Sequence, residues 1–139
     1  MKANIKLSCT TESFWHILSE SVKEEIKKAT GTKPTKIIKG YTYSTMSKDK
    51  KMLKVQIEEY EENKIYASLV NKNNYSVRIK YELKKIDDYK VHVTMSQNII
   101  PERSLPIHQI INTRLEMKRM MVKMGVAARQ WEEENNKAK

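Results

Sequence analysis

Apolar and polar residues alternate with two different periods along this chain. Between Tyr75 and Lys84 every second residue is apolar, which is the pattern of a strand with one buried face. Between Phe14 and Ile26 apolar residues recur at steps of three and four, which is the pattern of a helix with one buried stripe. Along the whole chain the two patterns predict strands at 5–9, 37–46, 53–58, 65–70, 75–84 and 91–95, with a bend or bulge at Gly40. They predict a first helix of about 18 residues between Thr10 or Thr11 and Gly31, and a second helix at 105–134.

Residues that begin and end helices flank both helical segments. Thr10 or Thr11 can accept a backbone N–H and cap the first helix, and Gly31 can take the left-handed conformation that ends it. Ser104 is the expected cap of the second helix, and Pro106 suits its first turn, where no N–H is required. The boundaries of the two helices are therefore predicted independently of their apolar stripes.

The order of elements, β-α-β-β-β-β-β-α, predicts the α+β class. Short polar turns between successive strands favour an antiparallel meander, because parallel neighbours need long crossovers. The strict alternation at 75–84 leaves one sheet face wet, so the helices must cover the other face. We expect a curved antiparallel six-stranded sheet wrapped around the long C-terminal helix. Residues 1–139 contain no linker or repeat and are predicted to form a single domain.

At the level of these elements the chain resembles the START-like superfamily of helix-grip folds, also called the polyketide-cyclase-like or SRPBCC group. More narrowly, it resembles a small bacterial family of unknown function within that group. The resemblance rests on Thr10–Trp15, Ala29–Gly31, Asn73–Val77, Tyr81–Leu83 and the long terminal helix. It implies a cavity between that helix and the sheet, often occupied by a lipid-like, sterol-like or polyketide-like molecule. Other members of the group act through their surfaces, as chaperone cofactors or toxins.

Methionine and tyrosine side chains are the apolar candidates for lining such a cavity. The stripe of the terminal helix places Met117, Met121 and Met124 inward, where flexible thioethers either fit a ligand or simply fill the core. Tyrosines on the strands offer a ring and a hydroxyl to a ligand, although most strand tyrosines merely lie between core and surface. The predicted cavity residues are Tyr41, Tyr43, Val55, Tyr75, Tyr81, Ile110, Arg114, Met117, Met121 and Met124.

Arg114 is the one charge within the inward stripe of the terminal helix. Ile110 and Met117 flank it at helical spacing, so an ideal helix directs all three the same way. A buried guanidinium requires an acidic partner or a ligand anion, whereas a long stem also allows the charge to reach solvent. We predict that Arg114 lies at the mouth of the cavity, with its stem packed and its head in solvent or on an acidic partner.

No group of residues predicts catalysis or metal binding. His16, His92 and His108 are far apart in sequence, and Cys9 has no second cysteine with which to bind zinc. Paired acids such as Asp87–Asp88 fall in turns, where nothing would tune a general acid. The sequence therefore predicts no catalytic residue, no metal, no cofactor and no enzymatic activity.

The net charge of +10 raises the question of nucleic-acid binding. Residues 1–70 hold 13 basic and 9 acidic side chains, and residues 71–139 hold 14 and 8, so the excess is spread evenly. Specific nucleic-acid binding is therefore not expected. The single cysteine and the absence of a signal peptide or a long apolar run predict a cytoplasmic protein that does not insert into membranes.

Three functional hypotheses remain open. The first is a non-enzymatic binding module that holds a small apolar or amphipathic ligand under the terminal helix. The second is a partner-binding or self-association module, a homodimer for example, anchored by Trp131 near the end of that helix. The third is weak electrostatic binding of nucleic acid.

Overall fold

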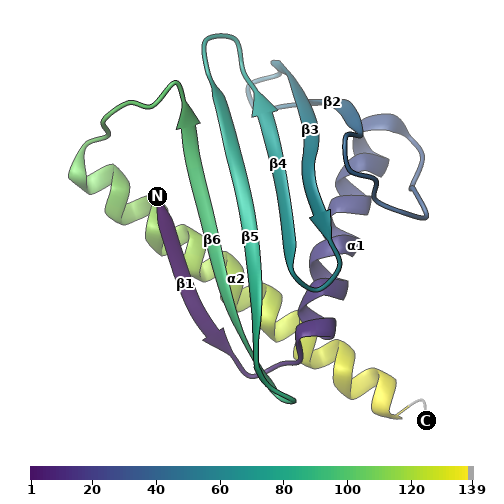
Figure 1. The fold of residues 1–139 in the computed structure, drawn as a ribbon. Helices are drawn as coiled ribbons and strands as arrows, with labels where there is room; N and C mark the ends of the chain where they lie inside the picture. Colours follow the sequence, from purple (N-terminus) through teal and green to yellow (C-terminus); the bar gives the residue numbers. More distant parts are fainter. Residues whose placement is uncertain (138–139) are drawn as a thin grey trace.

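One six-stranded antiparallel sheet and two helices make up the computed structural model, which describes residues 1–137 (Figure 1). The sheet order is β1-β6-β5-β4-β3-β2, and every neighbouring pair is antiparallel. The prediction of a helix-grip α+β fold is confirmed. The elements are β1 (Lys2–Leu7), α1 (Thr11–Thr30), β2 (Thr42–Met46), β3 (Met52–Glu61), β4 (Ile65–Asn71), β5 (Ser76–Asp87), β6 (Lys90–Ile100) and α2 (Ile107–Lys137).

The path of the chain explains the sheet order. The strands β2 to β6 follow one another as hairpins, because each polar turn is too short for a crossover. β1 pairs with β6, with Ile5 opposite Val93, so the first strand lies beside the last. α1 joins the two edge strands β1 and β2, and both helices lie behind the sheet in the view of Figure 1.

The two faces of the sheet differ as the alternation predicts. Tyr81 lies opposite Met95 on β6 and Tyr66 on β4, and all three are buried on the helix side of the sheet. On the outer side, the Arg78 guanidinium binds both carboxylate oxygens of Glu58, at 2.6 and 3.2 Å. The sheet therefore has a single apolar face, which is the face that the helices cover.

α1 begins and ends where the sequence indicates. The Thr10 hydroxyl accepts a hydrogen bond from the Ser13 N–H at 3.0 Å, so Thr10 is the N-cap. Gly31 ends the helix with a φ of 85°, a conformation that strains any residue with a Cβ. The inward stripe of α1 is buried at Phe14, Leu18, Val22 and Ile26.

α2 differs from the prediction at its first turns. Its first residue is Ile107 rather than residue 105, and the Pro106 carbonyl accepts a bond from the Ile110 N–H at 3.1 Å, so Pro106 takes the cap position expected for Ser104. Ile107, in the first turn, is 76% exposed. Full burial begins only at Met117 and continues through Met121 and Ala128. The inward stripe of α2 is thus a core face only from Met117 onward.

β2 is also shorter than predicted. The strand expected at 37–46 begins at Thr42, because Gly40 has a φ of 90° and bends the chain before it. The Gly40 N–H donates to the Ile57 carbonyl, and the Ile57 N–H donates to the Tyr41 carbonyl, so this bend still follows the edge of β3. Neither helix within residues 1–137 is long and apolar enough to cross a membrane. Residues 138 and 139 of the predicted domain lie outside the described residues.

Candidate ligand-binding site

Burial on the helix side of the sheet decreases along the strands. Near the middle of the sheet, Ile57 and Met95 are almost completely buried under the helices. Toward the end of the sheet that carries the β4–β5 turn, Val70, Val77 and Ile99 are only half-buried. α2 packs against β1 and α1, and its first turns leave this part of the apolar face uncovered. The uncovered part is therefore the candidate site.

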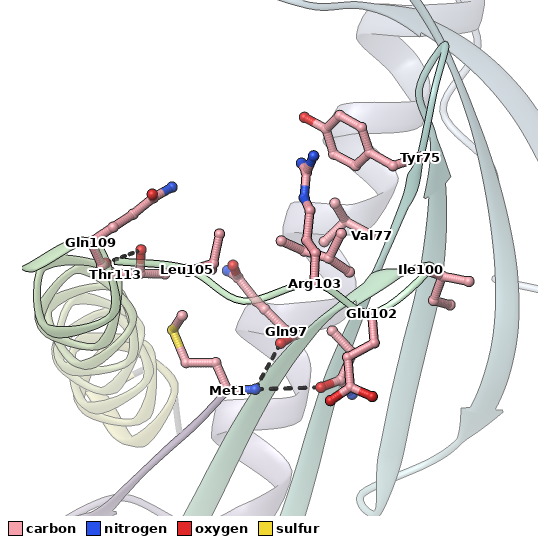
Figure 2. A pocket seen from close by; sticks show the side chains of 12 residues that line it. Met1, Tyr75, Val77, Gln97, Ile100, Glu102, Arg103, Leu105, Gln109 and Thr113 are labelled. Atoms are coloured by element: carbon pink, nitrogen blue, oxygen red, sulfur yellow. Dashed lines mark hydrogen bonds between the residues drawn. The ribbon is translucent and has the colours of Figure 1, made fainter. Parts of the chain in front are cut away.

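A pocket of about 550 Å³ occupies this place, between the sheet and the first half of α2 (Figure 2). Its apolar floor comes from β5 and β6, and Gln109 and Thr113 of α2 face it from the other side. The segment that joins β6 to α2 closes one end. The lining residues are Met1, Tyr75, Val77, Gln97, Asn98, Ile99, Ile100, Glu102, Arg103, Leu105, Gln109 and Thr113.

Tyr75 and Arg103 form a cation–π pair at the rim. The Arg103 guanidinium carbon lies 4.4 Å from the centre of the Tyr75 ring, and Figure 2 shows the two side chains together at one end of the pocket. Lys72 Nζ also lies 5.4 Å from the same ring centre. A ring in contact with two cations is held in place, and the cations leave this rim positively charged.

A second pocket of about 590 Å³ adjoins the first and shares Met1, Glu102, Arg103 and Leu105 with it. It adds Ile110 and Arg114 of α2. Arg114 is exposed, and it belongs to no ion pair among the residues that the structure describes. Two arginines and one glutamate therefore surround the joint opening of the pockets.

Seven of the ten predicted cavity residues lie outside these two pockets. Met117, Met121, Val55, Tyr43 and Tyr81 are buried, and Met124 is half-buried against the same core. Tyr41 precedes β2, is 39% exposed, and lines a separate hollow with Ile26 and Ile37. The structure brings together only Tyr75, Ile110 and Arg114 at the joint opening.

The buried tyrosines belong to the core, and their surroundings raise the pKa values of their hydroxyl groups. The Tyr81 hydroxyl donates to Met120 Sδ at 3.4 Å, and burial raises the pKa of Tyr81 to about 12. Burial, followed by the negative charge of Glu25, raises the pKa of Tyr43 as well. Both phenols therefore stay protonated and neutral at physiological pH.

Trp131 packs on its own chain. Its ring stacks on His16 of α1 with centroids 4.2 Å apart, and the side chain is half-buried. Beside it, Glu132 Oε1 accepts a hydrogen bond from the Thr10 N–H at 2.7 Å. Arg129 Nη1 donates to the Ser8 carbonyl at 3.0 Å. These contacts attach the end of α2 to the junction of β1 and α1, where the sequence suggested a projecting tryptophan.

Cys9 lies at the same junction and is 1% exposed. Burial, together with the negative charge of Glu132, raises the pKa of its thiol to about 11, so the thiol is protonated and a poor nucleophile. Within residues 1–137, no three His, Cys, Asp or Glu side chains gather closely enough to hold a metal ion.

Most of the pocket's walls were missed because the last strand was predicted too short. The expected strand ended at Met95, whereas β6 continues to Ile100 and brings Gln97 and Ile99 into the floor. The alternation of Met95, Gln97 and Ile99 continues the period of the strand and would have extended it. Arg103 and Leu105 lie in an irregular connection, where periodicity carries no signal.

A curved antiparallel sheet around a long C-terminal helix defines the START-like helix-grip fold. The chain belongs to the family DUF3284, a domain of unknown function, whose family model matches residues 1–115. No protein of curated function matches the chain in sequence.

Solved structures share the fold at low sequence identity. MLL2253 from Mesorhizobium loti is 13% identical with a TM-score of 0.64, and the match covers 94% of this chain and 98% of that one. A norcoclaurine synthase point mutant from Thalictrum flavum, in complex with a transition-state analogue, is 6% identical with a TM-score of 0.63 over 95% and 94% of the two chains. The Aha1 dimer from Colwellia psychrerythraea is 12% identical with a TM-score of 0.58 over 92% and 96%. At these identities the likeness extends to the fold alone.

Proposed function

We propose that this protein binds a small amphipathic molecule, with an apolar body and an anionic head, in the pocket under the first half of α2. The observation that carries the proposal is the uncovered apolar floor of Tyr75, Val77 and Ile99 in a fold whose remaining core is filled. An apolar surface that the protein does not cover itself gains free energy when a ligand covers it.

The dimensions of the pocket suit a molecule of this kind. Ligand pockets in proteins typically enclose roughly 300–1,000 Å³, and this one encloses about 550 Å³. Its apolar floor lies in the sheet, and its polar groups, Gln97, Gln109 and Thr113, come from opposite walls. An apolar chain on the floor, with its polar end at the opening, satisfies both kinds of surface.

The charge at the opening favours an anionic head group. Arg103 and Arg114 outnumber Glu102 there, and Arg114 has no acidic partner among residues 1–137. A guanidinium binds a carboxylate through two parallel hydrogen bonds, which are stronger than bonds between neutral groups. We therefore assign head-group recognition to Arg103 and Arg114.

The proposal includes binding without chemical conversion of the ligand. Glu102 and Arg103 are exposed, and the remaining polar side chains of the pocket are three amides and the hydroxyls of Tyr75 and Thr113. A general acid or base needs a position against the substrate that tunes its proton affinity, and these exposed groups lack one. Norcoclaurine synthase shares the fold, so turnover of bound ligand is the outcome that would overturn this part of the proposal.

The test compares two neighbouring positions on α2. Thr113 faces the pocket, and its hydroxyl bonds only to the Gln109 carbonyl of its own helix, whereas Asn112 is exposed and lines no part of the pocket. The tryptophan of Thr113→Trp fills the pocket. The affinity of this variant for dodecanoate, measured by calorimetry, is therefore expected to fall about tenfold or more, which corresponds to a loss of roughly 1.4 kcal/mol of binding free energy or more. Asn112→Trp serves as the matched control and is expected to bind as wild type does.

Native mass spectrometry of the purified protein provides an independent measurement. We expect a bound molecule that organic extraction releases and that the Thr113→Trp variant retains less well. Equal dodecanoate affinity of Thr113→Trp and wild type would contradict the assignment of the pocket, and no binding by wild type would contradict the proposed function.

A further inference from the structure

α2 carries a second apolar face, which is exposed. Its members, Ile107, Ile111, Leu115, Val122 and Val126, are between 42% and 76% exposed, and we call them the outer stripe. Their steps of four, four, seven and four residues confine them to a sector of about 100° around the helix. From the first to the last member, the stripe is about 29 Å long at the usual rise per residue.

The outer stripe is distinct from the core face of the same helix. The core face is centred on Met117 and Met121, and the outer stripe lies about 120° around the helix from it. An amphipathic helix of a globular protein normally has one apolar stripe, with polar residues on the remaining surface. A second aliphatic row of this length is therefore an unexplained exposed apolar surface, which is typical of an interaction site.

The charges around the outer stripe have one sign. Between Ile107 and Gln130, α2 has five basic residues and a single acidic one, Glu116. On the helix, Lys118 lies within the sector of the stripe, and Arg114 and Arg119 lie along the borders of that sector. Glu116 points about 130° away from the centre of the stripe. Among residues 1–137, none of the ion pairs involves these three cations. The surface therefore combines a row of aliphatic side chains with cations within it and along its borders.

We propose that this face of α2 docks on an anionic lipid membrane. Interfacial helices place aliphatic side chains at the boundary between head groups and acyl chains, while their lysines and arginines interact with lipid phosphates. The stripe lies along one side of a single helix and so forms a ridge, and its residues line none of five pockets found among residues 1–137. A flat lipid surface fits a convex ridge, whereas a helical peptide requires a groove.

A second copy of the chain is a poor occupant, because a two-fold contact through this face would bring Lys118 and Arg119 against like charges. The position of the helix also suits a membrane. Figure 1 shows α2 crossing the whole breadth of the sheet, with its first turns projecting beyond β1 in this view. Docking of this face leaves the helix–sheet pocket intact, so the inference does not depend on the proposed ligand.

The test is cosedimentation with vesicles of two parts phosphatidylcholine to one part phosphatidylserine, and of phosphatidylcholine alone, at physiological salt. Wild type is expected to bind the mixed vesicles and not the neutral ones. Ile111→Ser/Leu115→Ser is expected to lower the partition coefficient about tenfold or more, since apolar burial contributes to interfacial binding. Lys118→Gln/Arg119→Gln is expected to lower it roughly thirtyfold, as two lost cations predict.

The matched control changes the same net charge elsewhere. Lys54→Gln/Lys84→Gln removes two exposed lysines from the sheet, outside α2, and is expected to bind as wild type does. Circular dichroism verifies that each variant is folded. Loss of binding in this control as large as in the α2 variants, or undiminished binding by the serine variant, would overturn the proposal.

Three other results would also overturn it. The first is failure of wild type to bind the mixed vesicles. The second is a dimer in sedimentation velocity that the serine variant abolishes, which would assign the face to a second copy. The third is saturable binding of a designed acidic amphipathic helix without vesicle binding. Thr113→Trp is expected to keep vesicle binding, so failure of the ligand proposal and failure of this one remain distinguishable.

Discussion

Two parts of α2, residues 107–116 and 117–137, differ in what their inward faces meet. In the second part, Met117, Met121 and Ala128 are buried against the sheet and α1. In the first part, Ile110 points in the same direction as Met117, but it is only half-buried and lines a pocket. The comparison shows that the inward face of a helix becomes core only where another element lies against it.

Specific contacts hold the second half in place. Gly125 allows β1 to approach the helix, because a Cβ at this position would lie 2.9 Å from a methyl carbon of Leu7. Farther along, the bond from the Thr10 N–H to Glu132 attaches the helix to the start of α1. The first half has no equivalent attachment to the sheet, and this difference keeps the pocket open. The predictions below test the comparison in order of decreasing effect on stability.

The largest effect is expected from truncating a buried side chain of α2. Met121 is 0% exposed, so Met121→Ala leaves a cavity and should lower the free energy of unfolding by about 2–5 kcal/mol. Ile107→Ala, in the open half, should change it by less than about 0.5 kcal/mol. Urea unfolding monitored by circular dichroism measures both. Equal losses would show that the two halves are packed alike.

A side chain at Gly125 should separate α2 from β1. Gly125→Val places methyl groups against Leu7, and overpacking of this kind should cost about 1–3 kcal/mol of unfolding free energy. The double variant with Leu7→Ala should lose less than the sum of the two single variants, because the truncation makes room for the valine. Strict additivity in the same urea titrations would exclude this contact as the cause.

The attachment of the helix end should contribute less. Glu132→Ala removes the acceptor of the Thr10 N–H and is expected to cost about 1–2 kcal/mol of unfolding free energy. Glu133→Ala is the matched control, since Glu133 is exposed and, among residues 1–137, forms only a 3.9 Å ion pair with Arg129. It should cost less than about 0.5 kcal/mol. Similar midpoints for the two variants in thermal unfolding would contradict a special role of Glu132.

The smallest effect on stability, and a clear effect on binding, is expected at Arg114. This side chain is exposed at the pocket opening, so Arg114→Leu should change the unfolding free energy by less than about 0.5 kcal/mol. Its affinity for dodecanoate should fall about tenfold through loss of a charge-assisted bond, while its affinity for dodecanol stays unchanged. Parallel loss of both affinities would assign Arg114 a packing role and not a head-group role.

Local signals predicted the elements well. The strict alternation at 75–84, the cap at Thr10 and the left-handed Gly31 all correspond to observed features, because each depends on near neighbours in sequence. The errors lie at the ends of elements. The last strand was predicted to end at residue 95 but ends at Ile100, and the strand predicted to begin at residue 37 begins at Thr42. The bend expected at Gly40 is present, but it ends the strand pattern there and does not only interrupt it, so β2 begins after it.

The candidate site was predicted less completely than the fold. Tyr75, Ile110 and Arg114 line the two pockets, whereas Met117 and Met121 fill the core. Both groups lie on apolar faces, and a periodicity argument cannot separate them. Whether an inward side chain meets a neighbour or an opening depends on the distance between helix and sheet, which is set by contacts between residues far apart in sequence.

By itself the sequence determined the order of strands and helices, the single wet face of the sheet and the family resemblance, since these follow from local periodicity, turns and caps. Only the tertiary structure decided how far α2 remains in contact with the sheet. That limit depends on the close approach of Gly125 to Leu7 and on the Glu132–Thr10 bond, which join residues more than a hundred positions apart. Because these contacts hold only the second part of the helix, residues 107–116 are left with an open pocket on their inward side, while the exposed aliphatic row continues along α2 as far as Val126.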